Sequence, residues 1–350
     1  MSEHDTPYSL LSQSRRKKLC DIIPLEMPLS LYVDPSSHCN FYCRFCARNH
    51  KDYRNYAGQD CFLRMDIFKK LSREIKEWGV LKSLKMYYLG EPFLNPNMLE
   101  MVHEAMYLGI AERIEITTNG SMLTREISEG LLSLCRRYTT IPLYLRFSIY
   151  SVIPERHYYL TSSPITVQQI HDNIAYLWKI RTEKKQKLPF IYVKMIDPCS
   201  EERRHFIEYY RDIADEVQIE EPMNWNGYES FRFDAPYNSQ QSPCLNNELQ
   251  KGRSRKACPY PFYSLVINAD ADVVCCCVDW NRMTKVGNLR EQTLKDIWFG
   301  NALHEFQTLH LNGFRQENSG CRNCNVLNRC PPDDDIDDVP AEQLWEKDFG

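Results

Sequence analysis

No stretch of this sequence can cross a membrane as a helix, because none approaches the roughly 18 to 20 continuous apolar residues of a span. The chain also lacks an excess of positive charge, since 43 lysines and arginines are set against 47 aspartates and glutamates, a net charge of −4. That balance excludes a global basic field for nucleic acid or anionic membranes. Residues 1–5 are polar and do not resemble a secretory signal. We therefore expect a cytoplasmic protein with neither nucleic-acid nor membrane partners.

Cysteine, by contrast, is abundant, with 15 among 350 residues. The count is odd and most of the cysteines fall into two groups, which argues against a framework of disulfides. In a cytosolic chain, clustered cysteines favour metal binding or catalysis. The two groups are therefore the first candidates for a functional site.

The first group has CX3CX2C spacing and comprises Cys39, Cys43 and Cys46, with Phe45 directly before the third. Structural zinc takes four ligands, and the only nearby fourth would be a histidine. A [4Fe–4S] cluster held by three thiolates keeps one iron open, and an open iron can bind polar groups of a substrate. From the residues alone, both a zinc knuckle or ordinary thiol cluster and an iron–sulfur site stay open.

The same spacing resembles the signature of the radical S-adenosylmethionine (SAM) enzymes. The resemblance implies that the open iron chelates the amino and carboxylate groups of SAM. An electron from the cluster then cleaves SAM to a 5′-deoxyadenosyl radical. A flavodoxin- or ferredoxin-type electron donor is the partner implied.

Helix and strand patterns alternate through the first two thirds of the chain. Apolar residues at helical spacing predict helices such as 65–78 and 167–185. The predicted strands are 31–34, 84–89, 114–117, 144–149, 190–196 and 216–220. Such alternation implies an α/β fold with a parallel sheet, and six units match the partial (β/α)6 TIM-like barrel of radical SAM enzymes. The cysteine loop directly follows the first strand, at the end where parallel α/β folds place active sites.

Three further motifs fit the resemblance in the right order. Gly90–Glu91 resembles the GGE motif whose backbone meets the SAM amino group, although Leu89 replaces its first glycine. A TNG turn follows the third strand, and a serine on the fourth strand stands where the family often contacts SAM. The implied SAM contacts are Gly90, Glu91, Thr118, Asn119, Gly120 and Ser148.

The second cysteine group lies near the C-terminus. Cys258 precedes a predicted hairpin over 264–278 that ends in three consecutive cysteines, and a Gly-Asn strand, a helix over 293–308 and a CX2C pair follow. This order resembles the SPASM/twitch extension of radical SAM enzymes. The resemblance implies one auxiliary [4Fe–4S] cluster; a rubredoxin-like or zinc site is the alternative, because four cysteines also suit zinc. The implied ligands are Cys258, Cys276, Cys321 and Cys324.

The full SPASM form carries CX2CX5CX3C and two auxiliary clusters. Here Cys330 completes CX2CX5C, but Asp334 occupies the last place and no cysteine follows Cys330. A second auxiliary cluster would need Cys244 or an unusual ligand. We therefore expect one.

With 350 residues, the chain is long enough for one large domain and a smaller one. We divide it into a leader (1–28), the radical SAM barrel (29–221), a linker (222–257), the SPASM/twitch domain (258–332) and an acidic tail (333–350). The acidic run at 333–338 is predicted to be solvated. No domain for a leader peptide is expected in 28 residues, which favours a carbohydrate or aminocyclitol over a ribosomal peptide.

The resemblance implies hydrogen abstraction from this small polar substrate, with two outcomes. An auxiliary cluster that accepts an electron gives dehydrogenation, as in aminocyclitol-modifying members. A thiol that returns a hydrogen to the opposite face gives epimerisation. Cys277 and Cys275 are the candidate donors, and Cys277 is favoured because Cys275 aligns with a proline in the usual turn. The candidate substrate contacts are Tyr87, Tyr88, Tyr150, Arg146 and Asp279.

Two other classes of function stay open. One is a peptide-modifying SPASM enzyme. The other is a non-catalytic Fe–S electron carrier, against which the SAM-site turns argue.

Overall fold

The computed structural model describes residues 17–196, 202–220, 255–322, 324 and 326–345. The predicted linker 222–257 lies almost entirely outside these residues, as do Cys199 and Cys244. No helix in the described ranges is long and apolar enough to span a membrane.

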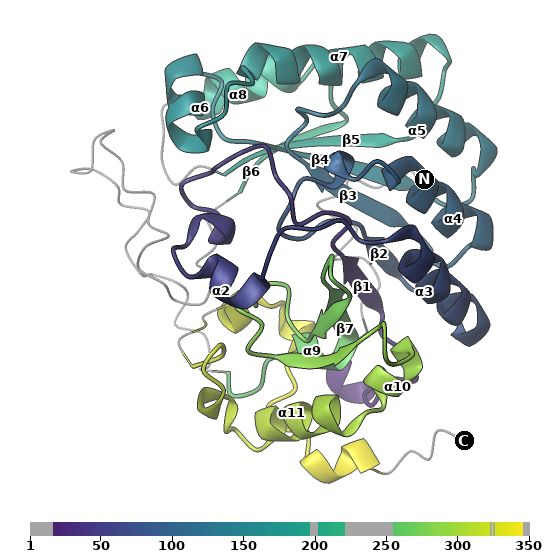
Figure 1. Ribbon diagram of the computed structural model, residues 1–350, viewed down its shortest axis with the longest axis vertical. Helices are drawn as coiled ribbons and strands as arrows, with labels where there is room; N and C mark the ends of the chain where they lie inside the picture. The colour runs from purple at the N-terminus through teal and green to yellow at the C-terminus, as the bar shows by residue number, and fades with distance from the viewer. Residues whose placement is uncertain (1–16, 197–201, 221–254, 323, 325, 346–350) are drawn as a thin grey trace.

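The described residues form one nine-stranded sheet in the order β6-β5-β4-β3-β2-β1-β7-β8-β9 (Figure 1). The first six strands are parallel, with helices in the connections, as expected for parallel pairing. Their bounds are β1 Ser30–Val33, β2 Ser83–Lys85, β3 Ile114–Thr118, β4 Leu143–Ile149, β5 Phe190–Ile196 and β6 Glu216–Glu220. The main helices are α3 Met65–Trp78, α4 Met98–Leu108, α5 Arg125–Arg137, α7 Val167–Glu183 and α8 Arg203–Tyr210. The predicted α/β fold and all six predicted parallel strands are therefore present.

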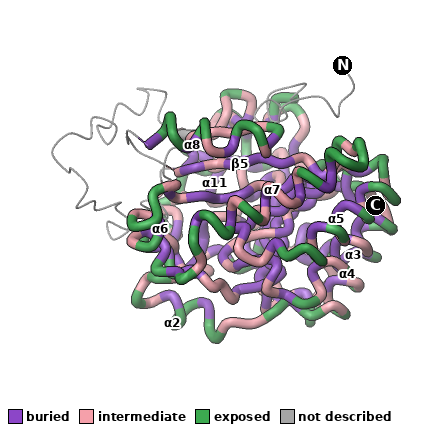
Figure 2. Tube along the Cα trace, turned by 90° about the horizontal axis from the view of Figure 1, so that it is seen from above, coloured by how far each residue is buried: buried purple, intermediate pink, exposed green. Residues whose placement is uncertain are grey.

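Each parallel strand has one apolar face and one polar face, because successive side chains alternate. On β4, Leu145 and Phe147 are fully buried in the main core, whereas Arg146 between them points to the other side of the sheet. On β5, Val193 belongs to the core and Lys194 to the other side. Figure 2 shows β5 as a buried strand beside α7 and α8, which mix buried and exposed residues. We call the side away from the core the polar face; it carries Tyr32, Lys85, Glu115, Arg146, Ser148, Tyr192, Lys194 and Glu220.

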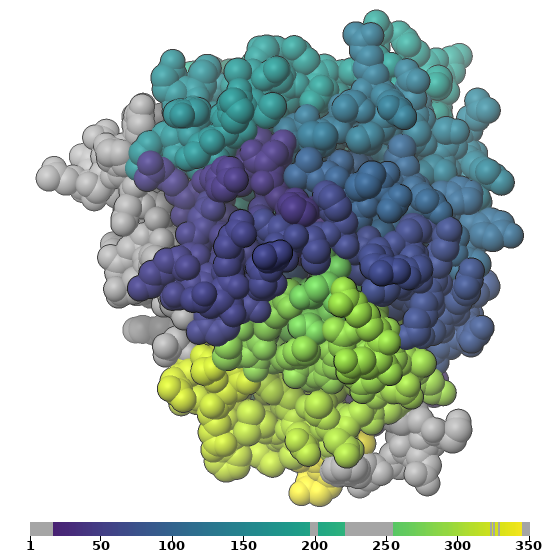
Figure 3. Space-filling view, viewed as in Figure 1, coloured from purple at the N-terminus to yellow at the C-terminus, as the bar shows by residue number. Residues whose placement is uncertain are grey.

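The C-terminal hairpin extends the same sheet. Strand β7 (Ser264–Ile267) pairs in parallel with β1, in register from Ser30↔Ser264 to Val33↔Ile267. Strands β8 (Asp272–Val274) and β9 (Lys285–Asn288) follow in antiparallel pairing. Figure 3 shows the C-terminal part packed directly against the N-terminal part.

The helix predicted over 293–308 is instead two helices, α10 (Leu294–Trp298) and α11 (Asn301–Leu311). The break lies at Gly300, where an added Cβ would sit 2.7 Å from the carbonyl oxygen of Asp296. Three short helices were not predicted: α2 Tyr53–Ala57, α6 Pro154–Thr161 and α9 Tyr260–Tyr263. Short 3-10 turns cover Leu19–Asp21, Ala47–Asn49, Pro92–Leu94, Arg315–Glu317, Val326–Arg329, Pro332–Asp334 and Ala341–Trp345.

The acidic run at 333–338 is partly buried and partly solvent-facing. Asp334 is only 6% exposed, and Ile336 is buried in a small second core with Leu19 and Ile23. The Asp337 carboxylate accepts hydrogen bonds from the backbone N–H groups of residues 256 and 257. Asp338 is exposed, as predicted for a solvated run, whereas Asp334 and Ile336 pack inward.

Candidate functional site

Three thiols lie in the loop after β1, and that of Cys43 is buried. Burial, followed by the charges of Glu91 and Cys46, raises the pKa of Cys39 to about 12. Burial, followed by the charges of Cys46 and Cys39, also raises the pKa of Cys43. The three cysteines lie within residues 39–46, and the Cys46 N–H donates to the Cys43 carbonyl oxygen at 2.9 Å. Because thiolates crowded in this way need a positive centre beside them, the donor set fits an iron–sulfur cluster.

The predicted Gly-Glu and Thr-Asn-Gly turns meet at this loop. The Glu91 carboxylate accepts hydrogen bonds from Thr118 Oγ1 (2.7 Å) and from the Asn119 N–H (2.8 Å). The Glu91 N–H donates to the His38 carbonyl oxygen at 2.8 Å. Asn119 Nδ2 lies 3.9 Å from Cys39 Sγ. The Glu91 side chain therefore joins the two turns, and its backbone N–H holds them to the loop of the first cysteine group.

Gly90 and Gly120 are required by their surroundings. A Cβ on Gly90 would lie 1.7 Å from the Ser36 carbonyl oxygen, so only glycine lets this turn approach the loop after β1. Gly120 has φ +77°, a left-handed conformation that favours glycine. Leu89, which replaces the first glycine of the usual motif, is buried against Trp280.

The second cysteine group surrounds a cavity. Cys258, Cys276, Cys321 and Cys324 all line it. His310 is beside them, with Nδ1 accepting from the Cys258 N–H at 3.1 Å and Nε2 3.8 Å from Cys321 Sγ. Four convergent thiols around a cavity fit a cluster with four thiolate ligands. Cys330 does not line the cavity.

In the described ranges, no three His, Cys, Asp or Glu side chains are arranged to hold a single metal ion. A four-iron cluster is larger than one ion and spaces its ligands more widely.

The three consecutive cysteines face three different environments. Cys275 is fully buried in the main core, and its N–H bonds to Thr284. Cys276 lines the cavity. Cys277 packs with Tyr32 at the polar face. A hydrogen bond with Cys276, the charge of Lys85 and a hydrogen bond with Tyr32 lower the pKa of Cys277 to about 7.

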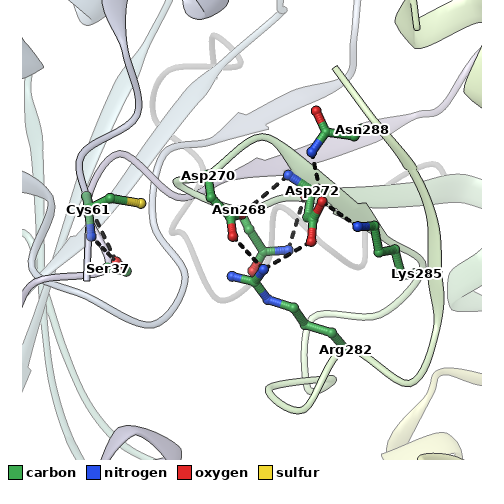
Figure 4. Close-up of polar contacts among 8 residues, drawn as sticks. All are labelled: Ser37, Cys61, Asn268, Asp270, Asp272, Arg282, Lys285 and Asn288. Carbon is green, nitrogen blue, oxygen red and sulfur yellow. Dashed lines mark hydrogen bonds and ion pairs between the residues drawn. The ribbon is translucent and has the colours of Figure 1, made fainter. Parts of the chain in front are cut away.

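An ion-pair network fixes the hairpin that carries these cysteines (Figure 4). Arg282 bridges Asp270 and Asp272, and Asp272 also pairs with Lys285 at 2.7 Å. Asn288 Nδ2 donates to the Asp272 carboxylate at 2.7 Å. These contacts tie both strands to the turn before Cys275, so the turn cannot shift freely. In the same view, Cys61 belongs to the loop after β1, where its N–H donates to Ser37 Oγ at 2.8 Å.

Hydrogen bonds link the polar face from strand to strand. Lys85 Nζ donates to Tyr32 OH at 2.9 Å, and Arg146 Nη1 donates to Tyr87 OH at 3.1 Å. At the far edge, the Glu220 carboxylate accepts from Arg146 (3.2 Å), Tyr192 (3.1 Å) and Lys194 (2.7 Å). Of these residues, the sequence analysis singled out Tyr87 and Arg146. The other polar residues could have been found from the sequence, because they alternate with apolar residues along the predicted strands.

The remaining predicted contacts differ in their surroundings. Asp279 accepts bonds from the N–H groups of Met283 (3.0 Å) and Thr284 (2.7 Å), so it shapes its own turn. Tyr150 packs on Phe45, with ring centroids 4.6 Å apart, beside the first cysteine group. Tyr88 OH is buried and has no hydrogen-bond partner among the described residues.

Family models match both parts of this arrangement. The Radical SAM superfamily model matches residues 33–182, and the SPASM iron–sulfur cluster-binding domain matches residues 258–325. The chain therefore contains a radical SAM domain and a SPASM domain. It is therefore an enzyme whose cofactors are SAM and iron–sulfur clusters, and the resemblance inferred from the sequence is confirmed.

Two curated relatives cover most of the chain. One is the tungsten-containing aldehyde ferredoxin oxidoreductase cofactor-modifying protein of Pyrococcus furiosus, 23% identical over 86% of this chain and 88% of its own. The other is the SAM-dependent 2-deoxy-scyllo-inosamine dehydrogenase of Niallia circulans, 29% identical over 84% of this chain and 91% of its own.

Solved structures share the fold. BtrN in complex with AdoMet and 2-DOIA has a TM-score of 0.53 at 17% identity, covering 85% of this chain and 93% of its own. AnSMEcpe with AdoMet and a peptide has a TM-score of 0.55 at 18% identity, covering 87% and 88%. The predicted fold, a partial barrel with a C-terminal cluster domain, is confirmed.

Proposed function

We propose that this radical SAM enzyme dehydrogenates a small polar substrate, a carbohydrate or an aminocyclitol. In this proposal Cys39, Cys43 and Cys46 hold the SAM-binding cluster. The auxiliary cluster is held by Cys258, Cys276, Cys321 and Cys324. When bound, SAM and its cluster would supply a 5′-deoxyadenosyl radical able to remove one C–H hydrogen, and the auxiliary cluster would provide an acceptor for the remaining electron, with the hydroxyl proton passing to solvent.

The pairing of β1 with β7 carries this proposal. Cys39 lies in the loop after β1, Cys258 precedes β7, and Cys276 follows β8, the next strand of the sheet. Because β1 and β7 are parallel and β8 is antiparallel to them, the first cysteine group lies at one end of these strands and the second at the other. In this proposal the polar face spans the distance between them. A substrate bound on the polar face would lie between the SAM-binding cluster and the auxiliary cluster. An oxidation in two one-electron steps requires such a position, because each step uses a different group. The similarity to a 2-deoxy-scyllo-inosamine dehydrogenase supports the same reaction class.

The residues of this chain have distinct parts in that reaction. The turns braced by Glu91 present backbone groups to SAM. Tyr32, Lys85 and Tyr87 supply hydroxyl and ammonium groups that orient a polyhydroxylated ring on the polar face. The buried walls keep water away from a reactive radical. A flavodoxin- or ferredoxin-type protein supplies the electron, and the enzyme works in the cytoplasm.

Epimerisation is the second candidate, and the position of Cys277 favours it. Cys277 meets Tyr32 and Lys85 at the polar face, whereas Cys275 is buried in the core. Of the two spare thiols, Cys277 is thus the one placed to return a hydrogen to a substrate radical.

Anaerobic reconstitution tests the proposal. Reduced protein with SAM should release 5′-deoxyadenosine, and replacing Cys39, Cys43 and Cys46 by alanine should abolish it. A matched variant, Cys20→Ala, should keep full activity, because Cys20 lies outside both groups. Deoxyadenosine formation in the triple variant would refute the assigned cluster site. With 2-deoxy-scyllo-inosamine as the first probe, a product two hydrogens lighter would support dehydrogenation.

A further inference from the structure

The far edge of the polar face holds a charge arrangement that the reaction itself does not use. Arg146 on β4 and Lys194 on β5 both pair with Glu220 on β6, at 3.2 and 2.7 Å. The side chains of Arg146 and Lys194 are only 13% and 12% exposed, while that of Glu220 is 33% exposed. Among the described residues, two nearly buried cations thus pair with a carboxylate that reaches solvent.

We propose that Arg146 and Lys194 form a binding site for an oxyanion of the substrate, a phosphate or a carboxylate. The Glu220 carboxylate occupies this site until the substrate arrives. The inference rests on the proposed function, because it assigns one group of the small polar substrate that the enzyme oxidises.

The energetics favour exchange of Glu220 for an incoming oxyanion. Buried cations are costly unless paired, so Arg146 and Lys194 hold whichever oxyanion lies between them. Glu220 is the most exposed of the three, with a third of its side chain exposed, so it is the group that can regain water when an oxyanion replaces it. Burial and the charge of Arg146 lower the pKa of Lys194 to about 8, whereas the charge of Glu220 raises it.

The chemistry of the donors suits an oxyanion. The planar guanidinium of Arg146 matches two oxygens of a carboxylate or phosphate, and Lys194 adds a point charge. Tyr192 OH, which now donates to Glu220 at 3.1 Å, supplies a third donor. Glu220 already mimics this ligand, since its two oxygens accept from all three residues.

The Arg146–Lys194 site lies at the opposite edge of the polar face from β1, where the proposed reaction takes place. Tyr87 connects the two ends, because it bonds to Arg146 at 3.1 Å and packs with Tyr32 beside Cys277. A substrate anchored by its oxyanion between β4 and β6 would extend along the face toward β1. Its reacting carbon would then lie near both cysteine groups.

A substrate ammonium bound by Glu220 is the competing arrangement. It is less favoured because both Glu220 oxygens already accept from cations. The two arrangements predict opposite effects of the same substitution, Glu220→Gln. Removing a competing carboxylate should strengthen oxyanion binding, whereas removing an amine ligand should not.

The experiment titrates the reconstituted, SAM-loaded protein with inorganic phosphate, and in parallel with acetate, by calorimetry at constant ionic strength. At least one of these anions should bind the unmodified protein. Arg146→Gln and Lys194→Gln should weaken binding about fivefold or more. Glu220→Gln should strengthen it about threefold or more. Lys82→Gln is the matched control and should change nothing, because Lys82 is exposed and pairs with Glu112.

The preference between the two anions identifies the substrate group. Failure of both to bind the parent and Glu220→Gln would overturn the proposal, as would unchanged or weaker binding in Glu220→Gln. If Lys194→Gln does not fold, the anion affinity of Glu220→Gln still tests the proposal, because misfolding cannot produce tighter anion binding. Deoxyadenosine release is measured in the same samples. Its absence refutes the proposed function, whereas SAM cleavage without anion binding refutes only this site.

Discussion

Glu91 and Thr118 join two strands of the barrel through a 2.7 Å hydrogen bond between the carboxylate and the threonine hydroxyl. Glu91 follows β2 and Thr118 ends β3, so this bond ties two separate turns together. Because the Glu91 N–H also bonds to His38, the same residue reaches the loop with the first three cysteines. A single buried carboxylate therefore holds these turns together beside the first cysteine group, and we predict that its substitution affects both stability and SAM binding.

The first prediction concerns pH. Burial raises the pKa of Glu91 from 4.5 to about 7, so the folded protein binds this proton more tightly than the unfolded chain. Stability through this group should rise as the pH falls from about 7 to about 4.5, by at most about 3 kcal/mol. Glu91→Gln should remove that gain. Thermal unfolding of both proteins at pH 5.5 and 7.5, compared as a difference, measures it.

Glu112→Gln is the control for this experiment, because the Glu112 side chain is 54% exposed. It should preserve the pH dependence of the parent protein. An identical pH dependence in the parent and Glu91→Gln would show that the Glu91 carboxyl does not titrate in this window.

The second prediction concerns SAM binding. Glu91→Pro removes the N–H that bonds to His38 and the carboxylate that holds Thr118 and Asn119. SAM affinity should fall about tenfold or more, since the three buried hydrogen bonds lost at this turn cost at least about 1.4 kcal/mol. Equilibrium dialysis with labelled SAM, on samples of equal iron content, measures the change. Unaltered affinity would move the SAM site away from this turn.

The third prediction concerns metal content. Seven assigned ligands imply two [4Fe–4S] clusters, so reconstituted protein should contain about eight irons and eight sulfides. Replacing Cys39, Cys43 and Cys46 together by alanine should leave about four irons. About twelve irons in the parent would mean that Cys330 or Cys244 helps to hold a third cluster. Stoichiometric zinc at the second group in freshly isolated protein would disprove the auxiliary cluster.

The fourth prediction concerns the potential of the SAM-binding cluster. The guanidinium of Arg48 interacts with the charges of Cys39 and Cys46, and its side chain is only 10% exposed. Losing this buried positive charge should make reduction harder. Arg48→Met should lower the midpoint potential by about 50 mV, roughly 1.2 kcal/mol for one electron. A redox titration followed by electron paramagnetic resonance measures the shift.

Arg54→Met is its matched control. Arg54 pairs with the same carboxylate, Asp60, but its side chain is 72% exposed. A buried charge acts strongly on a nearby cluster and an exposed charge is screened by water. Equal shifts in the two variants would refute a direct effect of Arg48.

Local patterns in the sequence predicted most of the fold. The six parallel strands follow from short apolar runs, and α3 follows from apolar residues at helical spacing. The pairing of β7 with β1 was not predictable, because it joins segments more than 200 residues apart and depends on long-range register. The break at Gly300 depends on the carbonyl oxygen of Asp296, a contact that hydrophobic periodicity does not encode.

The candidate site was predictable only in part. Cysteine spacing predicted both thiol groups, because ligand chemistry is local in sequence. Lys194 and Glu220 were missed, since a charged residue within a strand pattern usually indicates a solvent-facing position. Only the assembled sheet shows that both residues meet Arg146 on the polar face. The separate environments of Cys275 and Cys277 were also not predictable. Alternation predicts that their side chains point to the same side of a strand or to opposite sides, but not where the hairpin packs in the fold.

The last prediction separates oxidation from epimerisation. If the auxiliary cluster accepts the electron, the product is two hydrogens lighter than the substrate, and Cys277→Ala stays active. Cys276→Ala should then lose the product, because it removes a ligand of the acceptor. If Cys277 returns a hydrogen, product formed in D2O gains one deuterium and otherwise keeps the substrate's mass, since a thiol hydrogen exchanges with water.

For the proposed dehydrogenation we expect a product two hydrogens lighter than the substrate. Mass spectrometry of the product formed in H2O and in D2O detects this loss as well as the gain of one deuterium. Both variants should still release 5′-deoxyadenosine, because neither residue belongs to the SAM-binding group. Cys20→Ala controls for the loss of a thiol elsewhere. One deuterium per product, together with loss of product but not of SAM cleavage in Cys277→Ala, would establish epimerisation. The position of Cys277 beside Tyr32 and Lys85 would then be the decisive feature of the site, because it places the donor thiol where the substrate radical must be quenched.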